Sequence, residues 1–337
     1  MRGNRFTESL DPNEKNITFS LIAVFALWYD VFFPQVTYMG RLFQAESSPL
    51  TIDSPLYTIL FGWLQSWNFA LGVIALLMLI GVGGLAIRFN GNFAYIKVRT
   101  ILPAVFFCVI GSILFSHTFT LGTVLMVLLM GLLYANFYLA ETFNPICAFN
   151  GGMLIATMTL LSPWCVLLCI PTLIFYYSTS VLNARTFLGA LFGFIVPLLY
   201  ATLYFVVTND IETLTNYFIE GFKFFVFKYD LDDIEMCYLA FLGGTTAWAI
   251  GNFLVDNTHD NIKSRKQNTH IINLFLWMLA LMIIAVPDAK NLLHPLTLLW
   301  GLLLGRFFSV NSSKLSYILF FAFFGVSLLT YVLPHFL

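Results

Sequence analysis

Carboxylates close to the first apolar segment have the clearest potential for chemistry in this sequence. Asp30 lies just before Pro34, at the end of that segment. A carboxylate at bilayer depth is costly, which suggests a function. As a general base, Asp30 would take a proton from an acceptor hydroxyl. The favoured interpretation is nevertheless an interfacial carboxylate that contacts headgroup water or pairs with Arg41.

Asp53 is the second candidate catalytic carboxylate. It directly precedes Ser54 and Pro55, where a helix is expected to begin. An acidic side chain at such a position often caps the free backbone N–H groups of the helix. Capping is therefore the favoured interpretation of Asp53, and catalysis is the alternative.

A short acidic run offers oxygen ligands for a hard cation. Its members are Asp230, Asp232, Asp233 and Glu235. Carboxylate oxygens suit Mg²⁺ or Mn²⁺, and such a cation would bridge to a phosphate. The run lacks the glycine and the alternating ligands of a calcium-binding loop. A solvated loop without a metal is therefore the alternative.

Three basic residues, Arg41, Lys223 and Lys228, lie in the two polar segments that contain Asp53 and the acidic run. They could provide counter-charges for a lipid-linked phosphate. Their alternative role is to extend from interfacial helices into headgroup water, with the aliphatic stems packed on apolar surface.

The composition indicates which elements must position these groups. Hydrophobic residues make up 59% of the 337 residues and charged residues only 10%, which is too little polar surface to cover a soluble globule. The formal net charge of -1 excludes the strongly basic face of a nucleic-acid-binding protein. The five cysteines, an odd number in apolar surroundings, argue against a disulfide framework. We expect one all-α domain over residues 1–337, a polytopic membrane helical bundle.

Apolar runs near the ~20 residues that cross a bilayer predict about eleven transmembrane helices, within a range of ten to twelve. The region 146–178 is too long for one helix and short for two, and Pro163 and Pro171 are expected to break or cap the turn between the two. The first span lacks a following cleavage site, so it is expected to remain in the protein. The predicted spans are Ile17–Pro34, Trp67–Ile87, Thr100–Phe115, Phe119–Leu139, Ile146–Leu161, Trp164–Ser178, Thr186–Val207, Met236–Val255, His270–Val286, Asn291–Gly305 and Leu315–Leu333.

The basic residues predict the orientation, because they are retained on the cytoplasmic side during insertion. With a cytoplasmic N-terminus and eleven spans, four of the 16 basic residues fall outside and the rest inside. The outer ones are Arg41, Lys223, Lys228 and Lys290. This asymmetry predicts a C-terminus on the outer side of the membrane, which is the periplasmic side if the protein lies in a bacterial inner membrane.

Two outer loops then contain enough polar chain to build a site, residues 35–66 and 208–235. Each includes an amphipathic stretch, Tyr57–Trp67 in the first and Glu212–Tyr229 in the second, which predicts an interfacial helix. Every candidate site residue named above lies in or beside these loops, so any site is expected at the outer surface.

Two resemblances suggest an activity class. A first span that ends near Asp30, an outer loop and then Pro55-Leu56-Tyr57 resemble the GT-C fold glycosyltransferases, which transfer sugars from polyprenyl-phosphate carriers. Those enzymes usually have an acidic pair in the first outer loop, whereas this chain offers only the separate residues Asp30, Glu46 and Asp53.

The chain also resembles an uncharacterised inner-membrane family of Bacteroidetes, over most of its length. This second resemblance carries no known activity. It rests on Asn90, Arg99-Thr100-Ile101-Leu102-Pro103-Ala104, Phe149-Asn150-Gly151-Gly152, Arg185-Thr186-Phe187, Gly193 and Pro197.

Three functions follow as hypotheses. The leading one is a GT-C-like transferase of cell-envelope assembly, with membrane lipids and a polyprenyl-phosphate-linked sugar as partners. The second is a non-catalytic subunit or scaffold that binds other envelope membrane proteins. The third is a transporter, although buried charges and an inverted repeat are not evident. Gly81, Gly83, Gly84 and the pair Gly151-Gly152 are expected to permit close helix approach or local unwinding.

Overall fold

The computed structural model describes residues 14–32, 54–64, 67–115, 117–222, 233–256, 261–284, 289–311 and 313–332. Within these ranges the chain forms helices joined by turns and loops, without a strand. In lipid, a helix satisfies its own backbone N–H and C=O groups, which explains why apolar segments of this length become helices. The prediction of an all-helical bundle is confirmed.

Seven helices of the described part of the chain are long and apolar enough to cross a membrane. The protein is therefore a multi-pass helical membrane protein. The seven are α5 (Asn68–Phe93), α7 (Leu121–Thr142), α10 (Ala184–Val207), α12 (Asp233–Asp256), α13 (Ile262–Ile284), α14 (Ala289–Val310) and α15 (Lys314–Val332).

The other predicted spans correspond to shorter apolar helices. They are α2 (Glu14–Leu27), α6 (Leu102–Leu114), α8 (Pro145–Leu161) and α9 (Cys169–Ser178), the last preceded by a 3-10 helix, η2 (Pro163–Leu168). The first predicted span differs most, because α2 ends at Leu27 and a separate short helix, α3 (Tyr29–Phe32), follows.

The region 146–178 divides as the prolines suggest, but only one of them makes the break. Ser162 is extended, and Pro163 begins η2. Pro171 instead lies inside the first turn of α9, where the lack of its N–H costs little. The sequence therefore predicted the turn between the two helices correctly, with Pro163 at its break and Pro171 in the first turn of the helix that follows.

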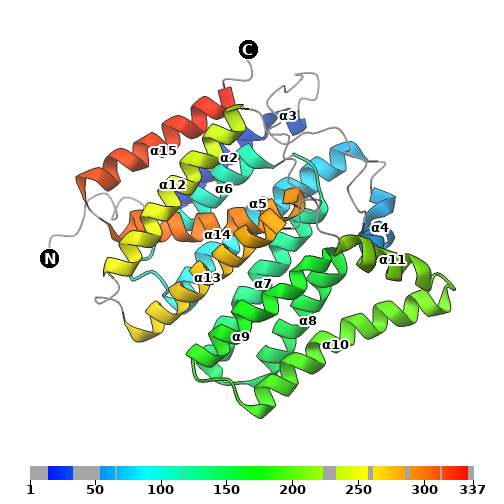
Figure 1. Ribbon diagram of the computed structural model, residues 1–337. Coiled ribbons are helices and arrows are strands. Elements are labelled where there is room, and N and C mark those ends of the chain that lie inside the picture. Colours follow the sequence, from blue (N-terminus) through cyan, green and yellow to red (C-terminus); the bar gives the residue numbers. More distant parts are fainter. Residues whose placement is uncertain are drawn as a thin grey trace.

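Helix α14 forms the centre of the bundle and α10 its edge, as Figure 1 shows. In the most apolar stretch of α14, 89% of the residues are buried, against 11% for α10. Helices α6, α7, α12 and α13 pack around α14, whereas α10 packs mainly on α8. The core is thus built around α14, and most of α10 faces outward.

Two short helices lie at one end of the bundle. They are α4 (Pro55–Phe61), followed by a 3-10 turn, and α11 (Ile211–Gly221). Ser54 caps α4, since its side chain accepts a hydrogen bond from the Tyr57 backbone N–H. Asp53, for which a capping role was predicted, lies outside the described residues. The remainder of the predicted Glu212–Tyr229 helix, beyond Phe222, lies outside the described residues.

The loop between α5 and α6 lies at the end of the bundle opposite α4 and α11, and hydrogen bonds hold it there. The Asn90 side chain donates to the Val98 carbonyl at 3.0 Å and accepts from the Ile96 N–H at 3.1 Å. The backbone carbonyl of Tyr95 accepts hydrogen bonds from Ser264 and Asn268 of α13. Burial raises the pKa of the Tyr95 phenol, and the positive charge of Arg306 partly opposes this effect.

Candidate functional site

Most of the residues predicted from the sequence for a catalytic site fall outside the described residues. These are Arg41, Asp53, Lys223, Lys228, Asp230 and Asp232. The structure gives only the backbone positions of Asp30, within α3, and of Asp233 and Glu235, in the first turn of α12. The described residues contain no group of three or more His, Cys, Asp or Glu side chains that could hold a metal ion.

Helices α4 and α11 are attached at one place, the end of α8. The Ser54 hydroxyl donates to the Leu160 carbonyl at 3.0 Å, and the Tyr217 hydroxyl donates to the Leu161 carbonyl at 2.7 Å. These bonds satisfy carbonyls that have no partner within α8, because they belong to its last turn. Helices α4 and α11 also contact each other. The structure thus joins two segments that are distant in the sequence.

This corner is where both predicted outer loops meet the described bundle. Asp53 directly precedes Ser54, and Lys223 directly follows Phe222. The Phe222 ring packs against Trp164 of η2, with 5.5 Å between the ring centroids. The described residues next to Asp53 in one loop and next to Lys223 in the other therefore lie at the same corner of the bundle.

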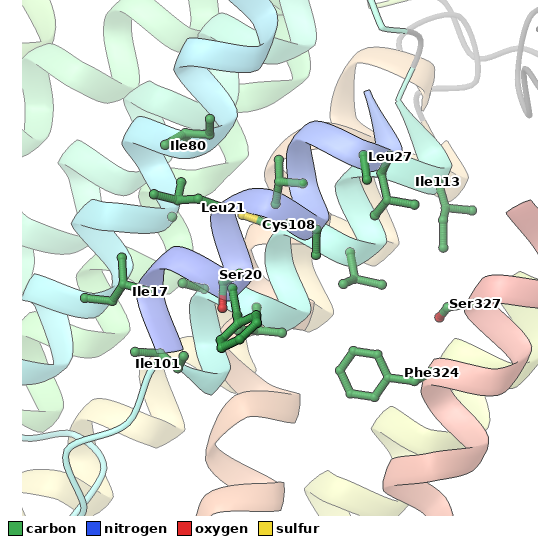
Figure 2. Close-up of a pocket in the computed structure, with 18 of the residues that line it drawn as sticks. Ile17, Ser20, Leu21, Leu27, Ile80, Ile101, Cys108, Ile113, Phe324 and Ser327 are labelled. Carbon is green, nitrogen blue, oxygen red and sulfur yellow. The ribbon is translucent and has the colours of Figure 1, made fainter. Parts of the chain in front are cut away.

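A large apolar groove lies on another side of the bundle. Its volume is about 750 Å³, and α2, α5, α6 and α15 form its walls. Figure 2 shows Ile80 of α5, Cys108 of α6 and Phe324 of α15 around α2. We call this feature the apolar groove.

The hydroxyl groups in the apolar groove are all engaged with the protein. Ser20 donates to the Asn16 carbonyl at 2.8 Å, and Tyr331 donates to the Leu27 carbonyl at 3.0 Å. Ser327 bonds to the Tyr238 hydroxyl at 3.2 Å. Because each hydroxyl has a partner, the groove presents a hydrocarbon surface and suits an apolar chain.

The apolar groove runs along α2 toward α3. Ile17 and Ile101 lie at one end and Leu27 and Ile113 at the other, as Figure 2 shows. Leu27 is the last residue of α2, and α3, which contains Asp30, follows directly. One end of the groove therefore lies close in the chain to the carboxylate that the sequence singled out.

The wall that α5 contributes is shaped by glycine. A Cβ atom on Gly83 would lie 3.1 Å from the Cys108 sulfur, whereas one on Gly84 or Gly81 would meet nothing within 4 Å. Helix α5 also continues without interruption through all three residues. The expectation of close approach or unwinding is therefore wrong for Gly81 and Gly84, and Gly84 leaves space in the groove instead.

A buried polar chain crosses the bundle where sequence reasoning found none. The Tyr176 hydroxyl donates to the Asn136 side-chain oxygen at 3.0 Å, and the Asn136 amide lies 3.1 Å from His270 Nε2. With the amide in this orientation, Asn136 donates to Nε2. The His270 ring also stacks on Phe175, with centroids 4.1 Å apart. Asn136 and Tyr176, as polar residues within apolar segments, were the available signal.

No protein-family model, no curated protein and no solved structure matches this chain.

Proposed function

We propose that the protein is a membrane enzyme of cell-envelope assembly that transfers a sugar from a polyprenyl-phosphate carrier, as the GT-C enzymes do. The observation that carries this proposal is the apolar groove, whose hydroxyls are all engaged and whose end adjoins α3. A groove of this kind suits the isoprenoid chain of such a carrier, because that chain has no polar group to satisfy.

In this proposal the carrier phosphate lies at the α3 end of the groove. Asp30 takes the proton of the acceptor hydroxyl, and the acceptor oxygen bonds to the anomeric carbon of the sugar. The bond between that carbon and the phosphate oxygen breaks, and the polyprenyl phosphate leaves with the electron pair. Arg41, Lys223 and Lys228 offset the charge of the phosphate.

The proposal includes a metal-assisted variant. Asp230, Asp232, Asp233 and Glu235 would then hold Mg²⁺ or Mn²⁺, which binds the departing phosphate.

The membrane topology that fits this function has eleven spans in a bacterial inner membrane. The spans are α2, α5, α6, α7, α8, the η2–α9 pair, α10 and α12 to α15, with a cytoplasmic N-terminus. Alternation then places α3, α4 and α11 on the periplasmic side, next to both polar loops. The basic residues support this orientation, because Arg88 near the end of α5 and Lys97 and Arg99 in the α5–α6 loop lie at the opposite end.

Two substitutions test the groove and the carboxylate separately. Gly84→Leu fills the groove from a position where the protein leaves open space, and Asp30→Asn removes the base. In cells without the native copy, we expect both variants to lose the envelope glycan that depends on this protein. Gly81→Leu is the matched control, since it lies one turn away on α5, in open space outside the groove.

Binding of a polyprenyl phosphate to the purified protein distinguishes the two roles. Gly84→Leu should bind it at least tenfold more weakly, whereas Asp30→Asn should bind it and fail to transfer. Normal glycans in both variants would rule out the transferase function.

A non-catalytic subunit is the second candidate, and the exposure of α10 favours it. Large apolar side chains such as Phe192, Leu199 and Tyr200 are exposed along this helix. Such a surface suits a membrane partner as well as lipid. Purification in mild detergent decides between the two: a stoichiometric membrane protein that is lost in a Phe192→Ala, Leu199→Ala double variant supports the subunit function.

A further inference from the structure

A second, smaller pocket lies between α8, α9 and α10. Its volume is about 140 Å³, and it shares no residue with the apolar groove. Ile155 of α8 forms one wall, Thr172 and Tyr176 of α9 a second, and Phe187 and Phe194 of α10 a third. We call it the α9–α10 pocket.

Thr172 is the polar group that distinguishes this pocket. Its side chain is 3% exposed, and its hydroxyl has no hydrogen-bond partner within the described part of the protein. By contrast, Thr159 and Thr246 each donate to the carbonyl four residues earlier, Thr159 to Ile155 at 2.8 Å and Thr246 to Leu242 at 2.7 Å. A buried hydroxyl without a partner is costly, so a ligand that supplies one would bind favourably.

Tyr176 provides a fixed wall beside Thr172. Its hydroxyl already donates to Asn136, and Asn136 in turn bonds to His270. Because this hydrogen is committed, Tyr176 contributes its aromatic ring to the pocket and no free donor. Thr172 is therefore the hydroxyl that remains to donate to a ligand.

The pocket opens toward the surface that faces lipid. Phe187 and Leu191 line it, and they are 47% and 42% exposed on α10. Tyr177, which follows Tyr176 on α9, is also largely exposed. A ligand would therefore enter from the bilayer.

We propose that the α9–α10 pocket binds a ring-sized, mainly apolar group with a carbonyl acceptor, presented by a lipid-soluble molecule. Apolar cavities of roughly 150 Å³ hold a benzene ring, which matches the volume of this one. Phe187 and Phe194 contact the ring, and Thr172 donates its hydrogen to the carbonyl oxygen. The site is independent of the proposed transferase function.

Two matched probes and two matched variants test this inference. The probes are 4-decylacetophenone, which has the ring carbonyl, and decylbenzene, which lacks it. Their affinities are measured on the full chain in lipid nanodiscs by native mass spectrometry. Thr172→Val should weaken binding of the ketone several-fold, up to about tenfold, and leave decylbenzene unchanged. Thr159→Val is the control, because the native Thr159 hydroxyl donates within its own helix. This variant should leave both affinities unchanged.

A third variant locates the site. Ala190→Leu fills the pocket from α10 and should abolish binding of both probes. Thermal unfolding without a probe should also show that Thr172→Val is at least as stable as the native protein, because it removes a buried hydroxyl without a partner. Equal ketone affinity in Thr172→Val and the native protein, or full binding by Ala190→Leu, would overturn the inference.

Discussion

The α8–α10 contact and the apolar groove both place glycine on an apolar helix surface, but they use it in opposite ways. A Cβ atom on Gly152 would overlap the Ala190 carbonyl, and one on Gly193 would overlap the Phe149 carbonyl. On α5, a Cβ atom on Gly84 would meet nothing within 4 Å. Glycine therefore lets two backbones touch in the first region and keeps a space open in the second.

The difference follows from what each helix has to pack against. Helix α10 is mostly exposed, and α8 is its main neighbour, so close backbone contact there supplies the attraction that holds it. Helix α2 packs on α6, and α5 and α15 form the other walls of the groove. Glycine thus allows close helix contact at the α10 edge of the bundle. Beside α2, glycine instead leaves space that can admit an apolar chain.

The largest expected effect comes from Gly193→Ala. The added methyl group would overlap the α8 backbone, which cannot move aside as a flexible side chain could. We expect a loss of about 1–3 kcal/mol in the free energy of unfolding, or more, measured in detergent. Gly251→Ala on α12 is the control, because its Cβ would meet nothing within 4 Å. Equal stability of the two variants would mean that α8 and α10 are not in close contact.

A smaller effect, of the opposite sign, is expected for Gly84→Ala. The methyl group enters open space, and alanine favours a helix over glycine. The free energy of unfolding should therefore rise by about 0.5–1 kcal/mol. A decrease would indicate that α2 or α15 closes onto Gly84 and that the groove is not open there.

The smallest effect is expected for Tyr331→Phe, which removes a bond across the end of the groove. The Tyr331 hydroxyl links α15 to the Leu27 carbonyl of α2 at 3.0 Å. Hydrogen bonds of this kind in membrane proteins contribute about 0.6 kcal/mol on average. Amide hydrogen exchange should become faster in α2 and stay unchanged in α10. An equal increase in both helices would show that Tyr331 supports the whole bundle and not the groove.

The sequence predicted much of the fold and little of what surrounds the groove and pocket. Pro163 marked the end of α8, and Pro55 marked the start of α4, because proline restricts its own φ and lacks an N–H wherever it occurs. The end of α2 at Leu27 was missed, since the apolar run continues past it. The sequence could not distinguish the roles of Gly84 and Gly152 either. A glycine in an apolar segment does not indicate whether it will face a neighbouring helix or an open space.

The sequence by itself determined that this is a multi-pass helical membrane protein. Apolar segments in lipid must satisfy their own backbone hydrogen bonds, and that requirement does not depend on their neighbours. Tertiary structure alone decided that Asn136 meets Tyr176 and His270, and that Thr172 lines a pocket. It also decided which glycines touch a neighbouring helix. These outcomes depend on how helices distant in the sequence pack, and packing brings together side chains that no local pattern connects.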